Sequence, residues 1–154
     1  MNHSFEVSME WRDNLGTGTS GYREYSRDHV VSAPGKADIA GSADKTFHGD
    51  ASRWNPEEML IAALSQCHML SFLHVAARAG VVVTFYRDSA SGMLETTPEG
   101  GGRITSVILA PEVEISRGEI EEMGALHEQA SKLCFIANSV NFPVSHQPVT
   151  TLNI

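Results

Sequence analysis

The stretch that decides the fold is Asn55-Pro56-Glu57-Glu58-Met59-Leu60-Ile61-Ala62-Ala63-Leu64-Ser65-Gln66-Cys67-His68-Met69-Leu70, which continues to Gly80. Asn55 is a favoured helix N-cap, Pro56 suits the first helical position, and Glu58 stands three residues after the cap. Gly80 is typical of a helix end. Between Met59 and Ala77 there is no Asp, Glu, Lys or Arg. The pattern therefore predicts one long helix that is buried along most of its length.

The segments around this helix alternate between apolar and polar residues or carry β-branched runs, which indicates strands. One further segment has helical spacing of apolar residues. The order of elements predicts an α+β fold, an antiparallel sheet packed on two helices. The expected strands are 5–11, 22–31, 36–43, 81–95, 103–116 with a break or bulge at Pro111, and 144–154, and the second helix is 119–137.

The composition is that of one soluble domain spanning residues 1–154. Eleven basic and nineteen acidic residues give a net charge of −8, which argues against nucleic acid or an anionic membrane as a partner. The N-terminus lacks the basic and apolar regions of a signal peptide, and polar residues such as Ser65, Gln66 and His68 interrupt the long helix too often for a lipid span. We expect a cytoplasmic protein.

The cysteine at the centre of the long helix is either an inert packing residue or a protected reactive thiol. Cys67 lies twelve residues after the cap, roughly 18 Å along the axis, so the helix dipole does not activate it. Burial alone raises a thiol pKa. A reactive Cys67 therefore needs a cation from elsewhere, and Arg27 is the first candidate, with Arg23 behind it.

Cys134 is the second thiol and falls in the second predicted helix. A permanent disulfide is not expected in a reducing compartment. If the two helices pack together, the sulfurs approach and form a reactive pair; if not, both are plain core residues. A metal site that combines the cysteines with His127 or His146 is a weak alternative, because no CxxC or HExxH spacing is present.

The motif Asn55-Pro56-Glu57-Glu58 leading to Ala63-Leu64-Ser65-Gln66-Cys67, with Cys134 in a second helix, resembles the OsmC/Ohr family of organic hydroperoxide reductases. The neighbouring strings Tyr25-Ser26-Arg27-Asp28-His29 and Cys67-His68-Met69-Leu70 resemble a less-studied OsmC-like subgroup. The resemblance covers nearly the whole chain. It implies an intertwined α+β homodimer, with two active sites at the subunit interface and a long buried central helix.

The resemblance also implies roles for four residues. Cys67 matches the peroxidatic cysteine, Cys134 the resolving cysteine, Glu57 the glutamate of the Asn-Pro-Glu motif, and Arg27 the active-site arginine. Arg53, in the loop before the long helix, is an alternative source of the arginine. Glu57 and Cys67 are ten residues apart, about 15 Å along one helix axis, so antiparallel pairing of two copies is needed to bring them into one site.

The implied activity is a thiol-dependent peroxidase that reduces organic hydroperoxides to alcohols through a Cys67 sulfenic acid and a Cys67–Cys134 disulfide. An external dithiol, of lipoyl type by resemblance, restores the thiols, and no metal or organic cofactor is expected. His68 departs from the Phe expected after the cysteine. Two rival hypotheses are a non-catalytic dimeric module that binds an apolar ligand, and a redox-sensing stress protein.

Overall fold

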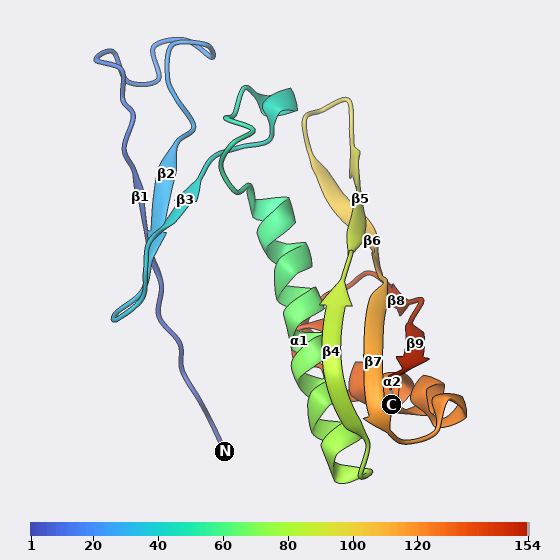
Figure 1. Ribbon diagram of the computed structural model, residues 1–154. Helices are drawn as coiled ribbons and strands as arrows, with labels where there is room; N and C mark the ends of the chain where they lie inside the picture. The colour runs from blue at the N-terminus through green and yellow to red at the C-terminus, as the bar shows by residue number, and fades with distance from the viewer. Residues whose placement is uncertain (154) are drawn as a thin grey trace. The chain divides into compact units, whose positions relative to one another are not determined.

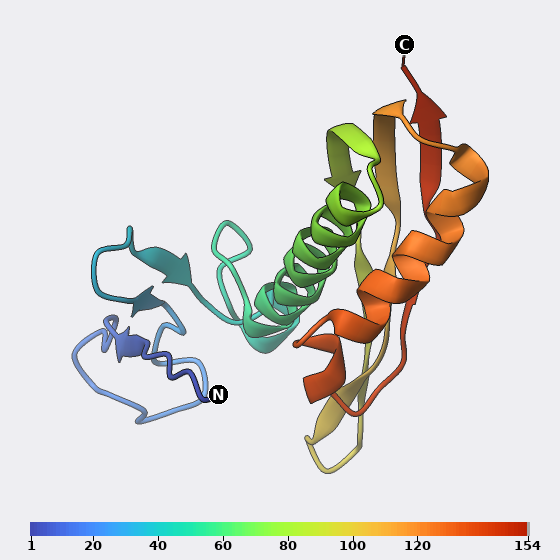
Figure 2. The ribbon, with the colours of Figure 1, turned by 90° about the horizontal axis from the view of Figure 1, so that it is seen from below.

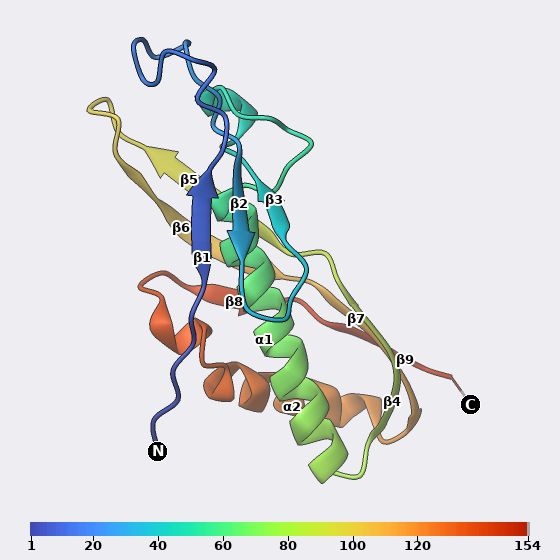
Figure 3. The same cartoon turned by 90° about the vertical axis from the view of Figure 1, so that its left-hand side faces the viewer.

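The computed structural model describes residues 1–153. The chain forms two compact units, Met1–Met59 and the segment from Leu60 onward, and the long helix runs across the boundary between them. The N-terminal unit holds a three-stranded antiparallel sheet (Figure 3). Its strands are β1 (Ser8–Trp11), β2 (His29–Ser32) and β3 (Ile39–Gly41), in the order β1-β2-β3. A short helix η1 (Lys45–Phe47) follows the sheet.

The long helix α1 (Pro56–Arg78) begins and ends as the sequence predicts. The side chain of Asn55 accepts a hydrogen bond from the Glu58 N–H at 2.8 Å, and the Glu58 side chain accepts one from the Asn55 N–H at 3.2 Å. This reciprocal pair is a capping box. At the other end Gly80 has a φ of 77°, and the N–H of Val81 bonds to the carbonyl of Ala76 at 3.0 Å, as in a Schellman motif.

The C-terminal unit contains two three-stranded sheets and a second helix (Figure 1). One sheet has the order β4-β7-β9 and the other β5-β6-β8. The elements are β4 (Val82–Asp88), β5 (Ser91–Thr96), β6 (Gly102–Leu109), β7 (Pro111–Arg117), α2 (Ile120–Leu133), η2 (Ala137–Ser139), β8 (Val144–His146) and β9 (Val149–Leu152).

Strand pairing confirms the predicted hairpin, but the C-terminal strands pair differently from the prediction. β4 pairs antiparallel with β7 and β5 with β6, so the two expected long strands form one bent hairpin that breaks just before Pro111. However, β8 and β9 run parallel to β6 and β7, so the sheets are mixed rather than purely antiparallel. The predicted strand 144–154 is two short strands, and its last residue, Ile154, lies outside the described residues.

Both helices cover the same face of the strands in the C-terminal unit (Figure 2). One core cluster joins α1 and α2 to β7 and includes Phe72, Ile115, Met123 and Ala130, and the second joins Leu64 to β6. In α1 only one stripe is buried, formed by Leu64, His68, Phe72, Val75 and Ala76. The prediction that α1 is buried along most of its length is therefore wrong for the single chain.

The length and mean hydropathy of α1 would by themselves allow it to cross a membrane. The same properties are typical of a core helix in a globular domain, and the buried stripe of α1 packs on the sheets and on α2. In this structure α1 is therefore a core helix.

Candidate functional site

Cys67 lies in the middle of α1, half-buried, at the wall of a cavity of about 390 Å³. Most of the cavity wall is apolar, and two polar residues of α1 complete it. The lining residues besides Cys67 are Leu70, Ser71, His74, Leu133 and Phe135. The cavity therefore offers an apolar surface directly beside a thiol.

Cys134 is the residue that ends α2, one position beyond the last helical residue, and its side chain is 1% exposed. Burial is the largest cause that raises the pKa of this thiol to about 11, and the adjacent Cys67 thiol is the next. The N–H of Ala137 donates to its sulfur at 3.4 Å. The structure thus brings the two sulfurs together as free thiols, although they stand 67 positions apart in the sequence.

Arg27 lies in the loop before β2, because that strand begins at His29. The expectation that residues 22–31 form one strand is wrong for this segment. The guanidinium lies over the ring of Tyr25, 3.9 Å from its centroid, and over Tyr22 at 4.8 Å. It also donates hydrogen bonds to the carbonyls of both tyrosines. Two cation–π contacts and two hydrogen bonds fix the position of this charge.

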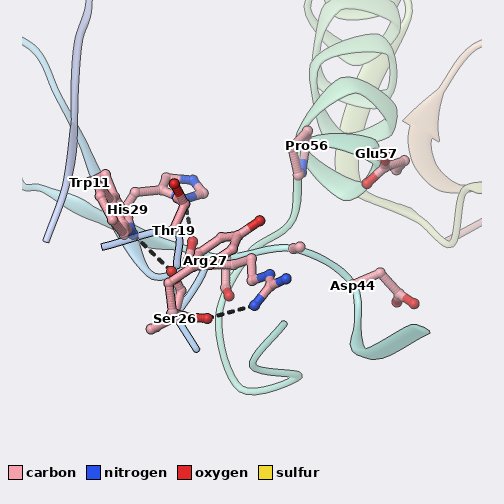
Figure 4. Close-up of a pocket in the computed structure, with 11 residues that line it drawn as sticks. Trp11, Thr19, Ser26, Arg27, His29, Asp44, Pro56 and Glu57 are labelled. Carbon is pink, nitrogen blue, oxygen red and sulfur yellow. Dashed lines mark hydrogen bonds between the residues drawn. The ribbon is translucent and has the colours of Figure 1, made fainter. Parts of the chain in front are cut away.

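Arg27 and Glu57 line one cavity of about 380 Å³ in the N-terminal unit. Glu57 comes from the first turn of α1, and Figure 4 shows the two side chains apart on the cavity wall. Among residues 1–153 no ion pair joins them. Trp11, His29 and Asp44 also line this cavity. A partner for the Arg27 guanidinium is therefore not supplied by Glu57 within a single chain.

The two alternative arginines have different surroundings. Arg53 donates to the carbonyls of Gly41 and His29, each at 2.9 Å, and lies 3.8 Å from the Asp28 carboxylate. These contacts join the end of β3 to the start of β2, so the Arg53 side chain stabilises the N-terminal sheet. Arg23 is exposed. Arg27 is the arginine that is both held in place and turned toward a cavity.

Sequence reasoning missed a buried histidine cluster next to the thiols. His68 of α1, His127 of α2 and His146 of β8 lie with ring centroids 5.3–5.9 Å apart. His68 and His127 are 2% and 0% exposed. Burial is the main cause that lowers the pKa of His68 to about 4 and that of His127 to about 3. The buried stripe Met123-His127-Ala130-Cys134 in α2 was the signal that could have found His127.

Within residues 1–153 no group of three or more His, Cys, Asp or Glu side chains is arranged to hold a metal ion. The site offers two free thiols and an apolar cavity, and the N-terminal unit holds a fixed guanidinium.

Comparison with known proteins gives a family and a fold. A family model described as OsmC-like protein matches residues 49–148. An OsmC-like protein of unknown function from Vibrio cholerae is 30% identical, with a TM-score of 0.86, covering 96% of this chain and 100% of that one. No curated protein sequence matches the chain.

More distant solved structures have the same fold. An organic hydroperoxide resistance protein from Elizabethkingia anophelis, solved with thiocyanate bound, is 18% identical with a TM-score of 0.68, covering 99% of this chain and 100% of that one. The organic hydroperoxide resistance protein OhrB of Bacillus subtilis is 16% identical with a TM-score of 0.65, covering 97% and 98%.

Proposed function

The chain belongs to the OsmC family, and from this premise we propose that it is a thiol-dependent peroxidase acting on organic hydroperoxides. The observation that carries the proposal is the contact between the Cys67 and Cys134 thiols at an apolar cavity. The names of the Elizabethkingia and Bacillus proteins, both organic hydroperoxide resistance proteins, support the choice of substrate class.

Cys67 is the residue that attacks the peroxide in this proposal, because it is half-exposed at the cavity whereas Cys134 is buried. The Cys67 thiolate attacks one oxygen of the O–O bond, the bond breaks, and the leaving alkoxide takes a proton to become an alcohol. Cys67 is then a sulfenic acid. The raised pKa keeps Cys134 in the thiol form at neutral pH, so Cys134 does not compete for the peroxide.

Cys134 then attacks the Cys67 sulfenic acid, a water molecule leaves, and a disulfide joins the two helices. An external dithiol reduces this disulfide and is itself oxidised to a disulfide. We assign this role to a dithiol of lipoyl type by analogy with the family. The apolar lining by Leu70, Leu133 and Phe135 favours a peroxide with a bulky hydrocarbon group over hydrogen peroxide.

Arg27 and Glu57 complete the site in this proposal, with Arg27 stabilising the thiolate and polarising the peroxide. Glu57 and Cys67 are on one helix, ten residues or about 15 Å apart, so they do not meet within a chain. We assign the completed site to a cytoplasmic homodimer, in which Glu57 of one chain approaches Cys67 of the other. Several apolar residues of α1 are only partly buried and Leu70 is 60% exposed, which gives the second copy a surface to cover.

The test is the steady-state consumption of cumene hydroperoxide with a dithiol reductant, with hydrogen peroxide as the comparison substrate. We expect turnover that is faster with the organic peroxide and that disappears in Cys67→Ser. Equal inactivity of the wild type and Cys67→Ser with every monothiol and dithiol reductant would overturn the peroxidase proposal and favour a binding module.

A further inference from the structure

The histidine cluster contains a hydrogen bond that joins the two helices carrying the thiols. His68 Nε2 and His127 Nδ1 are 3.0 Å apart, and the two ring planes are nearly parallel, at 7° to each other. Both rings are neutral at pH 7 because burial lowers their pKa values. One imidazole therefore donates its N–H and the other accepts.

The surroundings of this pair leave it little freedom to find other partners. The His127 ring stacks on Phe72 with centroids 4.0 Å apart, and its Nε2 has no hydrogen-bond partner among residues 1–153. The third ring, that of His146, bonds through Nε2 to Glu128 at 3.1 Å, toward the surface. A buried polar group that loses its partner pays its full desolvation cost. The His68–His127 bond is therefore a contact that the fold keeps in one geometry.

The His68–His127 hydrogen bond joins the same two helices that position Cys67 and Cys134. His68 follows Cys67 directly in α1. His127 belongs to the buried stripe of α2 and lies seven residues before Cys134, which directly follows that helix. Apolar contacts such as Phe72 with Met123 and Ala130 also hold the helices. However, apolar contacts are non-directional and tolerate repacking, whereas a buried hydrogen bond specifies one register.

We propose that His68 and His127 are positioning residues for the thiol pair, and that their hydrogen bond sets the register of α2 against α1 that places Cys134 at Cys67. The proposal deepens the proposed function, because it concerns the step in which the disulfide forms. It does not depend on peroxide turnover, since the closure of the two thiols can be measured by itself.

The experiment measures the rate at which diamide oxidises the reduced protein to the Cys67–Cys134 disulfide, a step termed closure. The two thiols give up two electrons and two protons, diamide becomes the hydrazine, and the Cys67–Cys134 bond forms. His68→Phe and His127→Phe keep a ring but remove the bond. His68→Gln and His127→Asn place an amide where the bonded Nε2 and Nδ1 stand. Phe72→Leu is the matched control, since it loosens packing on His127 and removes no hydrogen bond.

We expect closure to be about tenfold slower in each Phe variant, the change that one neutral hydrogen bond is worth. The amide variants should close at a rate near that of the wild type, as should Phe72→Leu. The equilibrium constant for disulfide formation against glutathione should fall in parallel with the closure rate. Near-UV circular dichroism verifies that each variant is folded, and a Leu substitution replaces any Phe variant that is not.

Three results would overturn the proposal. They are closure at the wild-type rate in folded Phe or Leu variants, closure in the amide variants as slow as in the Phe variants, and equal slowing by Phe72→Leu. A wild type that closes rapidly with diamide yet consumes no cumene hydroperoxide would contradict the proposed function and leave the positioning proposal standing.

Discussion

At the scale of single residues, Arg27 is the functional candidate outside the thiol pair whose side chain is held by the most contacts. Its guanidinium is fixed by Tyr22 and Tyr25 through ring faces and backbone carbonyls. Sequence analysis singled out this arginine, first as the cation that a reactive Cys67 needs and then through the family resemblance. The two aromatic contacts could not be predicted, because they depend on the path of the loop from 22 to 28. The single chain places no ion pair between Arg27 and Glu57, so that pairing stays a prediction for the dimer.

We expect Arg27→Ala to lower kcat/KM for cumene hydroperoxide on the order of 100-fold, the scale seen when a donor to developing negative charge is removed. Arg27→Lys should recover only part of this loss, because an ammonium cannot make the bidentate contacts of a guanidinium. Arg23→Ala is the control. A large loss in Arg23→Ala with full activity in Arg27→Ala would show that Arg23, and not Arg27, has this role.

The buried histidines predict how stability depends on pH. Their folded pKa values, about 4 for His68 and about 3 for His127, lie below the ordinary histidine value of 6.5. Between pH 6.5 and pH 4 the unfolded chain therefore binds more protons than the folded chain. The free energy of unfolding consequently rises with pH over this range and decreases as the pH falls from 6.5 toward 4. At about 1.4 kcal/mol per pKa unit, we expect a loss on the order of 3 kcal/mol from each ring by pH 4.

Urea unfolding at a series of pH values from 7 to 4 measures this dependence. His127→Phe should flatten the slope, because one of the two titrating groups is gone. A wild-type free energy of unfolding that stays constant down to pH 4.5 would show that these rings are not held neutral by burial.

At the scale of elements, α1 could be predicted almost to the residue. Its N-cap, its Pro at the first position and its terminal Gly act within one turn of the backbone, so they are visible locally. The strand 22–31 was wrong because Arg27 and the turn around it occupy the residues before His29. The parallel pairing of β8 with β6 and of β9 with β7 could not be predicted, since it joins residues 37 positions apart through contacts that leave no local pattern.

The capping box offers a test at this scale. Asn55→Ala removes the side-chain acceptor for the Glu58 N–H, and we expect it to lower the free energy of unfolding by about 1 kcal/mol. Urea denaturation gives the value from the shift in midpoint at constant slope. Gln66→Ala, at an exposed position in the middle of the same helix, should change the midpoint little. An Asn55→Ala midpoint equal to that of Gln66→Ala would contradict the assignment of the cap.

At the scale of the whole molecule, we expected a helix that is buried along most of its length. In the single chain, however, only one stripe of α1 is buried. The uncharged run between Met59 and Ala77 was read correctly as apolar, but its covering surface is not supplied by this chain alone. Composition shows how much apolar surface exists and cannot say which chain covers it. We therefore retain the homodimer as a prediction.

Sedimentation equilibrium should give a particle mass close to twice the chain mass of 16.7 kDa. Leu70→Asp places a charge on the exposed apolar face of α1 and should shift the equilibrium toward the monomer. Leu70 also lines the thiol cavity, so the contribution of the dimer to activity is measured with the wild type. Because the proposed site needs Glu57 of a second chain, peroxidase activity per chain should fall on dilution in proportion to the dimer lost. A wild type that remains monomeric at micromolar concentration yet turns over peroxide would contradict the shared site.

Intact-protein mass spectrometry of the reduced protein after one equivalent of cumene hydroperoxide tests the thiol pair directly. We expect a species lighter by two hydrogen atoms, with Cys67 and Cys134 joined by a disulfide and one equivalent of alcohol formed. Cys134→Ser should stop at the sulfenic acid of Cys67, and Cys67→Ser should remain unchanged. A wild-type mass that does not change, with both thiols still titratable and no alcohol released, would contradict the account.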